Sequence, residues 1–306
     1  LTITSTQDLD IQKICDEEVA DESYYPVTEY GLEYALTVHR ADGSVENYSK
    51  ENLAQYIRET QNDSNPLVFS SRDEAEEAIA SYKSSLNIDT ESGDIVDENY
   101  DITLQPQVSF VVMDQYTGQV KAIVGGRGEK SGNLTLNRAT DSKQQPGSCF
   151  KILSTYAPGL NEGDITLAST VVDEPYKYQS GQEVHNANGR YIGSTTVRNA
   201  ITQSINTCAV STLTETVGIG TGYEYVNNFG FTTLTAEDET QALALGSITD
   251  GVYNIELAAA FASIANNGTY SEPVLYTQIL DHDGNVLIDN TSPDTHEVIK
   301  DSTAYL

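Results

Sequence analysis

One lysine lies inside an apolar run directly after a predicted helix start, and this placement constrains the fold more than any other feature of the chain. Pro146-Gly147 marks the start of a helix, and Ser148 follows in its first turn. Lys151 comes three residues later, and its neighbours in sequence are mostly apolar: Cys149, Phe150, Ile152 and Leu153. The pattern predicts a buried helix whose first turn carries a serine and a lysine.

The spacing of Ser148 and Lys151 fits nucleophilic catalysis. Residues i and i+3 share a helix face and lie about 4.5 Å apart along the axis, so Lys151 can reach the Ser148 hydroxyl. Serine needs an adjacent base, and a neutral lysine serves if its pKa falls by roughly 3, a cost of about 4–5 kcal/mol that burial supplies. Free N–H groups at the helix start form an oxyanion site. The alternative is a capping serine beside a solvated lysine, because Ser-x-x-Lys is a common pattern.

A second pattern, Ser204-Ile205-Asn206, lies on or at the end of a predicted helix about fifty residues downstream. A hydroxyl and an amide two residues apart suit a turn that projects into a cleft. Ser204 could relay a proton between Lys151 and a leaving amine, and Asn206 could hold a substrate amide. Such a triplet also arises by chance, so its weight depends on the Ser148 segment.

The charge and composition of the chain exclude several function classes. Among 306 residues, 46 are acidic and 16 basic, and the net charge of −30 argues against non-specific binding to nucleic acid or to an anionic membrane. The cysteines form no CxxC pair and the histidines lack metal-ligand spacing, so no disulfide framework, metal or other cofactor is expected. No apolar run reaches the roughly 18–20 residues of a membrane span. Because the chain begins with Leu1 and not with Met, we interpret it as a piece of a longer protein.

The character of the chain changes near residue 105. Residues 1–105 are typical of a small mixed α/β linker module, with a hairpin that turns at Asp42-Gly43. Ser71 and Glu74 predict a capping box at the start of one of its helices.

Residues 106–306 open with a strand at 108–114, which we expect to be buried on both faces, and its hairpin partner. The other predicted elements are helices at 149–160 (ending near Pro158-Gly159), 196–217, 221–230 and 254–268, and a hairpin at 274–290 around Asp283-Gly284.

Four separated blocks connect the chain to one known family. In their sequence and order they resemble the transpeptidase region of class A penicillin-binding proteins, in the serine β-lactamase-like superfamily. The motifs of that superfamily are Ser-x-x-Lys, Ser-x-Asn and Lys-Thr/Ser-Gly. The blocks are residues 1–13, 110–126, 136–160 and 242–270, with Ser204-Ile205-Asn206 between the last two.

The resemblance implies an α/β (α+β) fold, with a β-lactamase/transpeptidase-like antiparallel sheet flanked by helices. It implies a serine D,D-transpeptidase that cross-links peptidoglycan through an acyl-enzyme. Ser148 would attack a D-Ala-D-Ala stem peptide, with Lys151 as base, Ser204 as proton relay and Asn206 holding the substrate; β-lactams would be inhibitors. The parent protein would carry a membrane anchor and a glycosyltransferase domain at the extracytoplasmic face of the bacterial membrane.

Three departures from the family pattern bear on activity. Gln144 stands where arginine is usual, and Cys149 stands where Ser or Thr is common. Lys130-Ser131-Gly132 precedes the nucleophile in a polar, loop-like stretch, so we reject it as the third motif. The true third motif would then follow Leu306, and we interpret residues 106–306 as a transpeptidase domain that is incomplete at its C-terminus and inactive if isolated.

Two alternatives stay open. A β-lactamase or D,D-carboxypeptidase would use the same residues but pass the acyl group to water. A penicillin-sensing module or an inactive fragment would not react at Ser148 at all. The presence of both the Ser148/Lys151 and the Ser204/Asn206 motifs favours an enzyme.

Overall fold

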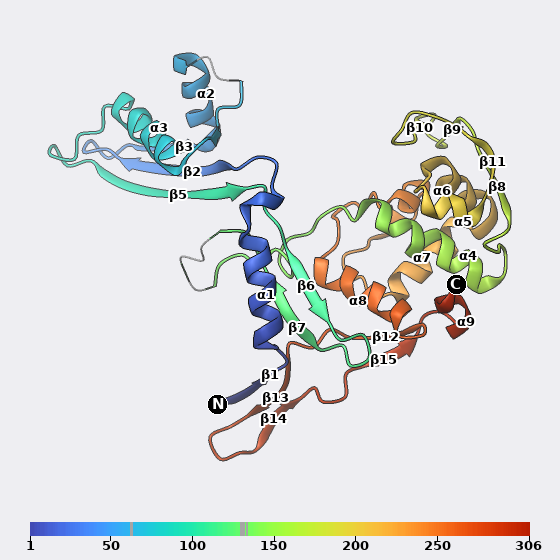
Figure 1. Cartoon of the computed structure of the whole chain (residues 1–306). Coiled ribbons are helices and arrows are strands. Elements are labelled where there is room, and N and C mark those ends of the chain that lie inside the picture. Colours follow the sequence, from blue (N-terminus) through green and yellow to red (C-terminus); the bar gives the residue numbers. More distant parts are fainter. Residues whose placement is uncertain (62–63, 129–131, 133) are drawn as a thin grey trace. The chain divides into compact units, whose positions relative to one another are not determined.

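The structure, a computed structural model, describes residues 1–61, 64–128, 132 and 134–306 (Figure 1). The chain forms two compact units. Unit 1 contains Leu1–Asp16, Ser109–Gly125 and Leu134–Leu306, and unit 2 contains residues 17–108 and 126–133. No helix in the described ranges has both the length and the apolar character needed to cross a membrane.

Unit 2 is an antiparallel sheet with two helices on one face. The central strand β2 (Glu29–His39) pairs with β3 (Val45–Ser49), β4 (Val68–Phe69) and β5 (Ile95–Gln105). Every second residue of β2 from Leu32 to Val38 is buried, because alternate side chains of a strand point to one face.

The two helices of unit 2 cover that buried face (Figure 1). They are α2 (Lys50–Gln61) and α3 (Arg72–Ser85), and a short turn, η1 (Glu22–Tyr24), precedes the sheet. Ser71 caps α3 by accepting a hydrogen bond from the Glu74 N–H. The Glu74 carboxylate bonds Ser70 instead of Ser71, so only half of the predicted capping box forms.

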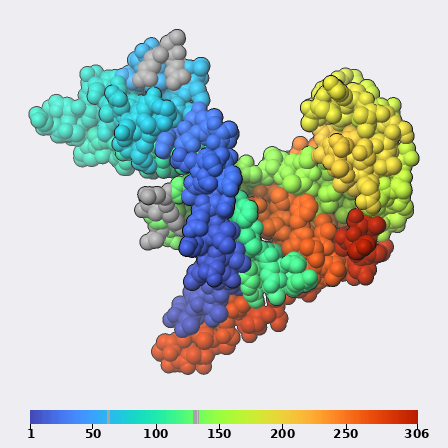
Figure 2. All heavy atoms as spheres, viewed as in Figure 1, coloured from blue at the N-terminus to red at the C-terminus, as the bar shows by residue number. Residues whose placement is uncertain are grey.

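In unit 1, a small three-stranded sheet pairs the first strand of the chain with a hairpin from its last quarter. β1 (Thr2–Ser5) pairs with β13 (Tyr276–Leu280), which pairs with β14 (Val286–Asp289), and Figure 2 shows the first residues lying against this hairpin. Thr6 adds side-chain hydrogen bonds to the carbonyls of Val120 and Val274. Residues 1–16 therefore lie in unit 1, which differs from the predicted boundary that places them in a module ending at 105.

The predicted hairpin at the start of the transpeptidase region forms, but it is less buried than expected. β6 (Phe110–Met113) pairs with β7 (Val120–Val124) and packs against α8 (Asn254–Ala265). Phe110 is 47% exposed and the rest of β6 is half-buried, so the prediction of burial on both faces is wrong. Within the described part of the chain, β6 has one strand partner, β7, and no strand pairs with its other edge.

The core of unit 1 is helical, and it surrounds the segment that carries Lys151. The largest fully buried side chains include Phe150, Tyr156 and Phe229. The helices around them are η3 (Lys151–Tyr156), α4 (Ala157–Glu162), α5 (Val197–Thr202), α6 (Asn206–Thr212), η4 (Leu213–Val217), α7 (Ile219–Asn228) and η6 (Gln241–Leu245).

Shorter elements complete unit 1. Three strand pairs lie outside the sheets already described: β8 (Thr170–Asp173) with β11 (Gly193–Thr196), β9 (Tyr176–Lys177) with β10 (Glu183–Val184), and β12 (Thr269–Ser271) with β15 (Thr295–Glu297). The remaining helices of the described residues are η2 (Gly147–Cys149), η5 (Ala236–Asp238), α9 (Asp301–Tyr305) and α1 (Leu9–Ala20). The residues of α1 up to Asp16 lie in unit 1, and its last turn lies in unit 2.

Two predicted helices differ from the structure in ways that matter for the site. The helix at 149–160 does not end at Pro158. It is a π-helix up to Tyr156 and continues as α4. Pro158 lies in the first turn of α4, where its missing N–H costs no helix hydrogen bond. The helix predicted at 196–217 breaks into α5 and α6, because Ser204 adopts a left-handed conformation with φ of 50°.

The π-helix η3 is held against α7 by a backbone-to-backbone approach at Gly222. A Cβ there would lie 2.4 Å from the Ser154 carbonyl oxygen and 2.5 Å from a Leu213 methyl. We expect Gly222→Ala to lower the free energy of unfolding by about 1–3 kcal/mol, since backbone must move. Gly220→Ala on the same helix meets only the flexible end of Glu239 at 3.1 Å, so a change below about 1 kcal/mol is expected. Chemical denaturation of both variants tests this, and equal losses would contradict it.

Candidate active site

Ser148 lies exposed on a segment that is anchored by its neighbours. It occupies the single turn η2, preceded by Gly147 with φ of 57°, while the next side chain but one, Phe150, is fully buried. The chain therefore presents the serine hydroxyl to solvent from a backbone fixed in the core.

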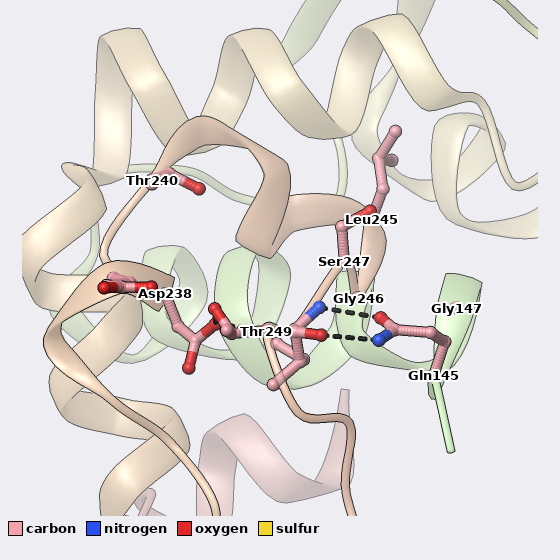
Figure 3. Close-up of a pocket in the computed structure, with 10 residues that line it drawn as sticks. Gln145, Gly147, Asp238, Thr240, Leu245, Gly246, Ser247 and Thr249 are labelled. Carbon is pink, nitrogen blue, oxygen red and sulfur yellow. Dashed lines mark hydrogen bonds between the residues drawn. The ribbon is translucent and has the colours of Figure 1, made fainter.

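A loop at 245–252 holds the residues before Ser148. Gln144 and Val252 exchange backbone hydrogen bonds, each 2.9 Å long. The side-chain amide of Gln145 donates to the Ile248 carbonyl oxygen at 2.5 Å and accepts from the Ile248 N–H at 2.7 Å (Figure 3). Gln144, where the family usually has arginine, contributes here through its backbone, so this contact does not depend on its side chain.

A hollow of about 500 Å³ lies between that loop and the nucleophile segment (Figure 3). Gly246 approaches the Gly147 backbone so closely that a Cβ would lie 2.3 Å from its carbonyl oxygen. The Asp238 carboxylate accepts hydrogen bonds from the backbone N–H and the hydroxyl of both Thr235 and Thr249. The hollow is lined by Gln145, Gly147, Glu237, Asp238, Thr240, Leu245, Gly246, Ser247, Ile248 and Thr249.

Lys151 is buried and hydrogen-bonded to oxygen atoms from a distant part of the sequence. Only 3% of it is exposed. Its Nζ donates to the Ser204 carbonyl oxygen at 2.6 Å, to Ser204 Oγ at 2.9 Å and to Asn206 Oδ1 at 2.6 Å. Burial lowers the pKa of Lys151 to about 8, against a smaller opposing effect of the Cys208 sulfur. At this pKa about one Lys151 side chain in ten is neutral at pH 7, far more than for a surface lysine.

The left-handed turn at Ser204 is what directs its two oxygen atoms toward Lys151. A positive φ in a residue other than glycine costs about 1–3 kcal/mol and persists where the surroundings enforce it. Because the turn separates α5 from α6, both the carbonyl and the hydroxyl of Ser204 leave the helix and accept from one ammonium group.

The Asn206 amide is oriented at both ends. Its Oδ1 accepts from Lys151, and its Nδ2 donates to the His185 carbonyl oxygen at 2.7 Å. The amide nitrogen carries two hydrogens, so its second N–H can serve a substrate carbonyl.

The structure thus brings together Lys151, Ser204 and Asn206. Among the described residues, Lys151 Nζ donates hydrogen bonds to Ser204 and Asn206, and the expected direct hydrogen bond to Ser148 is not formed. The Lys151 ammonium group instead donates to three oxygen atoms of the Ser204–Asn206 turn. Lys130 and Ser131 of the rejected third motif lie outside the described residues.

Sequence reasoning missed the residues that support this turn. Asp173, Asn186 and Thr207 form a buried hydrogen-bonded group behind Asn206. Nothing in their spacing indicates this, because they come from β8, from the segment after β10 and from α6.

Within the described residues, one group has ligand atoms close enough for a metal: Asp281, His282 and Asp283. These are consecutive residues at the tip of the β13–β14 hairpin, and the Asp281 carboxylate accepts hydrogen bonds from Asp283 and Asn285. Such bonds are typical of a hairpin turn, which agrees with the predicted turn at Asp283-Gly284.

Comparison with known proteins identifies the family. The family model described as the penicillin binding protein transpeptidase domain matches residues 108–306. The chain belongs to this family. The resemblance to penicillin-binding proteins predicted from the motifs is confirmed.

Curated relatives carry matching names. Penicillin-binding protein 1A of Clostridium acetobutylicum is 37% identical over 216 residues, 66% of this chain and 26% of the relative. Penicillin-binding protein 1F of Bacillus subtilis is 40% identical over 182 residues, 60% of this chain and 24% of the relative. The chain therefore spans about a quarter of the length of these relatives.

Solved structures confirm the predicted fold class. PonA1 of Mycobacterium tuberculosis, in complex with penicillin V, covers 99% of this chain with a TM-score of 0.61 at 16% identity, and the chain covers 61% of it. Penicillin-Binding Protein 1A of Haemophilus influenzae covers 94% with a TM-score of 0.53 at 24% identity, and the chain covers 40% of it. At these identities the likeness shows the fold.

The burial of Lys151 predicts that it titrates separately from surface lysines. NMR of ¹³Cε-labelled lysines should show one resonance with a pKa near 8, and that resonance should disappear in Lys151→Ala. Lys143 is the matched control, because its ion pair with Asp250 raises its pKa above the usual value. A Lys151 resonance that titrates above pH 10 would contradict the prediction.

Proposed function

We propose that the chain contributes the catalytic residues of a serine D,D-transpeptidase that cross-links peptidoglycan stem peptides ending in D-Ala-D-Ala. The observation that supports this most is the convergence of the buried Lys151 with Ser204 and Asn206, one turn after the exposed Ser148. A transpeptidase needs a hydroxyl nucleophile, a base of low pKa and a proton relay in one groove.

In the acylation step, Ser148 Oγ attacks the carbonyl carbon of the penultimate D-Ala. Neutral Lys151 accepts the hydroxyl proton, and N–H groups at the start of η2 and η3 stabilise the oxyanion. The C–N bond then breaks, and Ser204, hydrogen-bonded to Lys151, passes the proton to the nitrogen of the departing D-Ala. An ester on Ser148 and free D-Ala result.

In the second step, an amine of a neighbouring stem peptide attacks this ester. The new amide bond forms, the bond between the acyl carbon and Ser148 Oγ breaks, and the amine proton returns to Ser148 Oγ through Ser204 and Lys151. Asn206 would hold the stem peptide through its second N–H, because Lys151 and His185 fix the orientation of its amide.

The same attack on a β-lactam opens the ring and leaves Ser148 acylated, because the leaving nitrogen stays tethered to the acyl group. The complex of PonA1 with penicillin V supports this use of the fold. We place the reaction at the extracytoplasmic face of the membrane, where peptidoglycan lies, with an anchor outside this chain. Residues 17–105 would serve as a linker module.

A fluorescent penicillin tests the proposal in the full-length protein. We expect one covalent adduct, and peptide mass spectrometry should locate it on Ser148. Ser148→Ala should abolish labelling. Ser142→Ala, which changes a serine of the preceding loop whose hydroxyl accepts from Gln144, should label like the wild type. An adduct that persists in Ser148→Ala would refute the nucleophile.

The lifetime of the adduct separates the alternatives. A transpeptidase should keep the penicilloyl group for many minutes and release D-Ala from a stem peptide only in proportion to amide formed with an acceptor amine. Loss of the label within seconds would instead indicate a β-lactamase. Release of D-Ala without a new amide would indicate a D,D-carboxypeptidase, and absence of any label would indicate a binding module.

A further inference from the structure

A buried carboxylate lies behind the Ser204–Asn206 turn and takes no part in the proposed chemistry. Asp173, at the end of β8, is 2% exposed. Its Oδ1 accepts from Asn186 Nδ2 at 2.7 Å and from Thr207 Oγ1 at 2.5 Å, and its Oδ2 accepts from the Ile192 N–H at 2.9 Å. A carboxylate removed from water is stable only when its oxygens are occupied in this way.

Asn186 connects Asp173 to the first turn of α6 through hydrogen bonds. Its Oδ1 accepts from the backbone N–H of Asn206 at 3.0 Å and of Thr207 at 3.3 Å. Helices usually satisfy these donors with a Ser, Thr, Asp or Asn side chain at the N-cap, but the N-cap residue here is Ile205, which has no acceptor. An amide from another segment therefore performs the capping.

Two acceptors fix which way the Asn186 amide faces. The Asp173 carboxylate and the Arg190 carbonyl oxygen both accept from Asn186 Nδ2, at 2.7 Å and 2.9 Å, so the Asn186 oxygen must face α6. Thr207 adds a direct hydrogen bond, because its hydroxyl, in the first turn of α6, donates to Asp173 Oδ1. Asn186 is 9% exposed and Thr207 is 1% exposed, so water does not readily replace either contact.

The result is a continuous path of hydrogen bonds from Asp173 to Lys151. The backbone of Asn206 is held by Asn186, and its side chain accepts from Lys151 Nζ. Ser204, two residues earlier, accepts from the same Nζ. A displacement of the first turn of α6 would therefore move the acceptors of Lys151 together, and misplacement of about 1 Å can cost on the order of 100-fold in rate.

We propose that Asp173 is a positioning residue for acylation: through Asn186 and Thr207 it sets the Ser204–Asn206 turn against Lys151. The inference rests on the proposed function, since it concerns the rate of acylation of Ser148. Asp173 itself does not touch substrate, because it is enclosed behind the turn.

Thr207→Val provides the decisive variant, because it keeps the shape of the side chain and removes the hydroxyl. In the full-length protein, stopped-flow acylation by a fluorescent penicillin gives the limiting rate and the dissociation constant separately. We expect the limiting rate to fall about 10- to 100-fold in Thr207→Val and Asp173→Asn, with the dissociation constant changed less than about threefold. Thr207→Ser, which restores the hydroxyl, should recover most of the rate.

Thr6→Val is the matched control for a purely structural effect. Thr6 is also a buried threonine of unit 1, 6% exposed, whose hydroxyl donates to backbone carbonyls away from the site. It should lower the unfolding temperature while leaving the limiting rate within about threefold of wild type. A limiting rate in Thr207→Val equal to that of Thr6→Val, or no recovery in Thr207→Ser, would overturn the proposal.

Hydrogen exchange keeps this test separate from that of the proposed function. If the wild type takes no label, the proposed function fails, and amide exchange of residues 204–207 still reports on positioning. Faster exchange there in Thr207→Val, but not in Thr6→Val, is expected from a loosened turn. Equal exchange in all three proteins would overturn the positioning role.

Discussion

The burial of one ammonium group organises the site. A lysine that loses water must find oxygen acceptors or release its proton, and Lys151 does some of both. Two acceptors come from the Ser204 residue and one from Asn206, while burial lowers the pKa of the lysine. Because these acceptors are far from Lys151 in sequence, their convergence requires α5, α6 and η3 to pack in one arrangement.

Local irregularity produces that convergence. The two motifs lie where regular α-helix stops: Ser148 is on a 3₁₀ turn, Lys151 begins a π-helix, and Ser204 is left-handed. Strained or unusual backbone of this kind is often found at functional sites, where the surrounding core enforces it. Here the enforcing contacts are the Gly222 approach to Ser154 and the capping of α6 by Asn186.

The parts of the site that depend on short-range pattern were predictable from the sequence. Ser148, Lys151, Ser204 and Asn206 follow from two motifs, and the Asp283-Gly284 turn follows from its dipeptide. The π-helical register and the break at Ser204 depend on packing between distant segments, so residue spacing could not give them. The Asp173 network was out of reach for the same reason, because three unrelated segments supply it. The placement of residues 1–16 with unit 1 depends on pairing between the first strand and β13.

The contact between Gly246 and Gly147 limits how such a site can vary. Gly246 leaves no room for a side chain at that point, because a methyl group on it would meet the Gly147 carbonyl beside Ser148. A substitution of Gly246 would displace the segment that carries Ser148, the proposed nucleophile, for antibiotic and natural donor alike. On the proposed function, selection for slower reaction with penicillins must spare cell-wall synthesis, so it would act on other residues that line the groove and leave Gly246 unchanged.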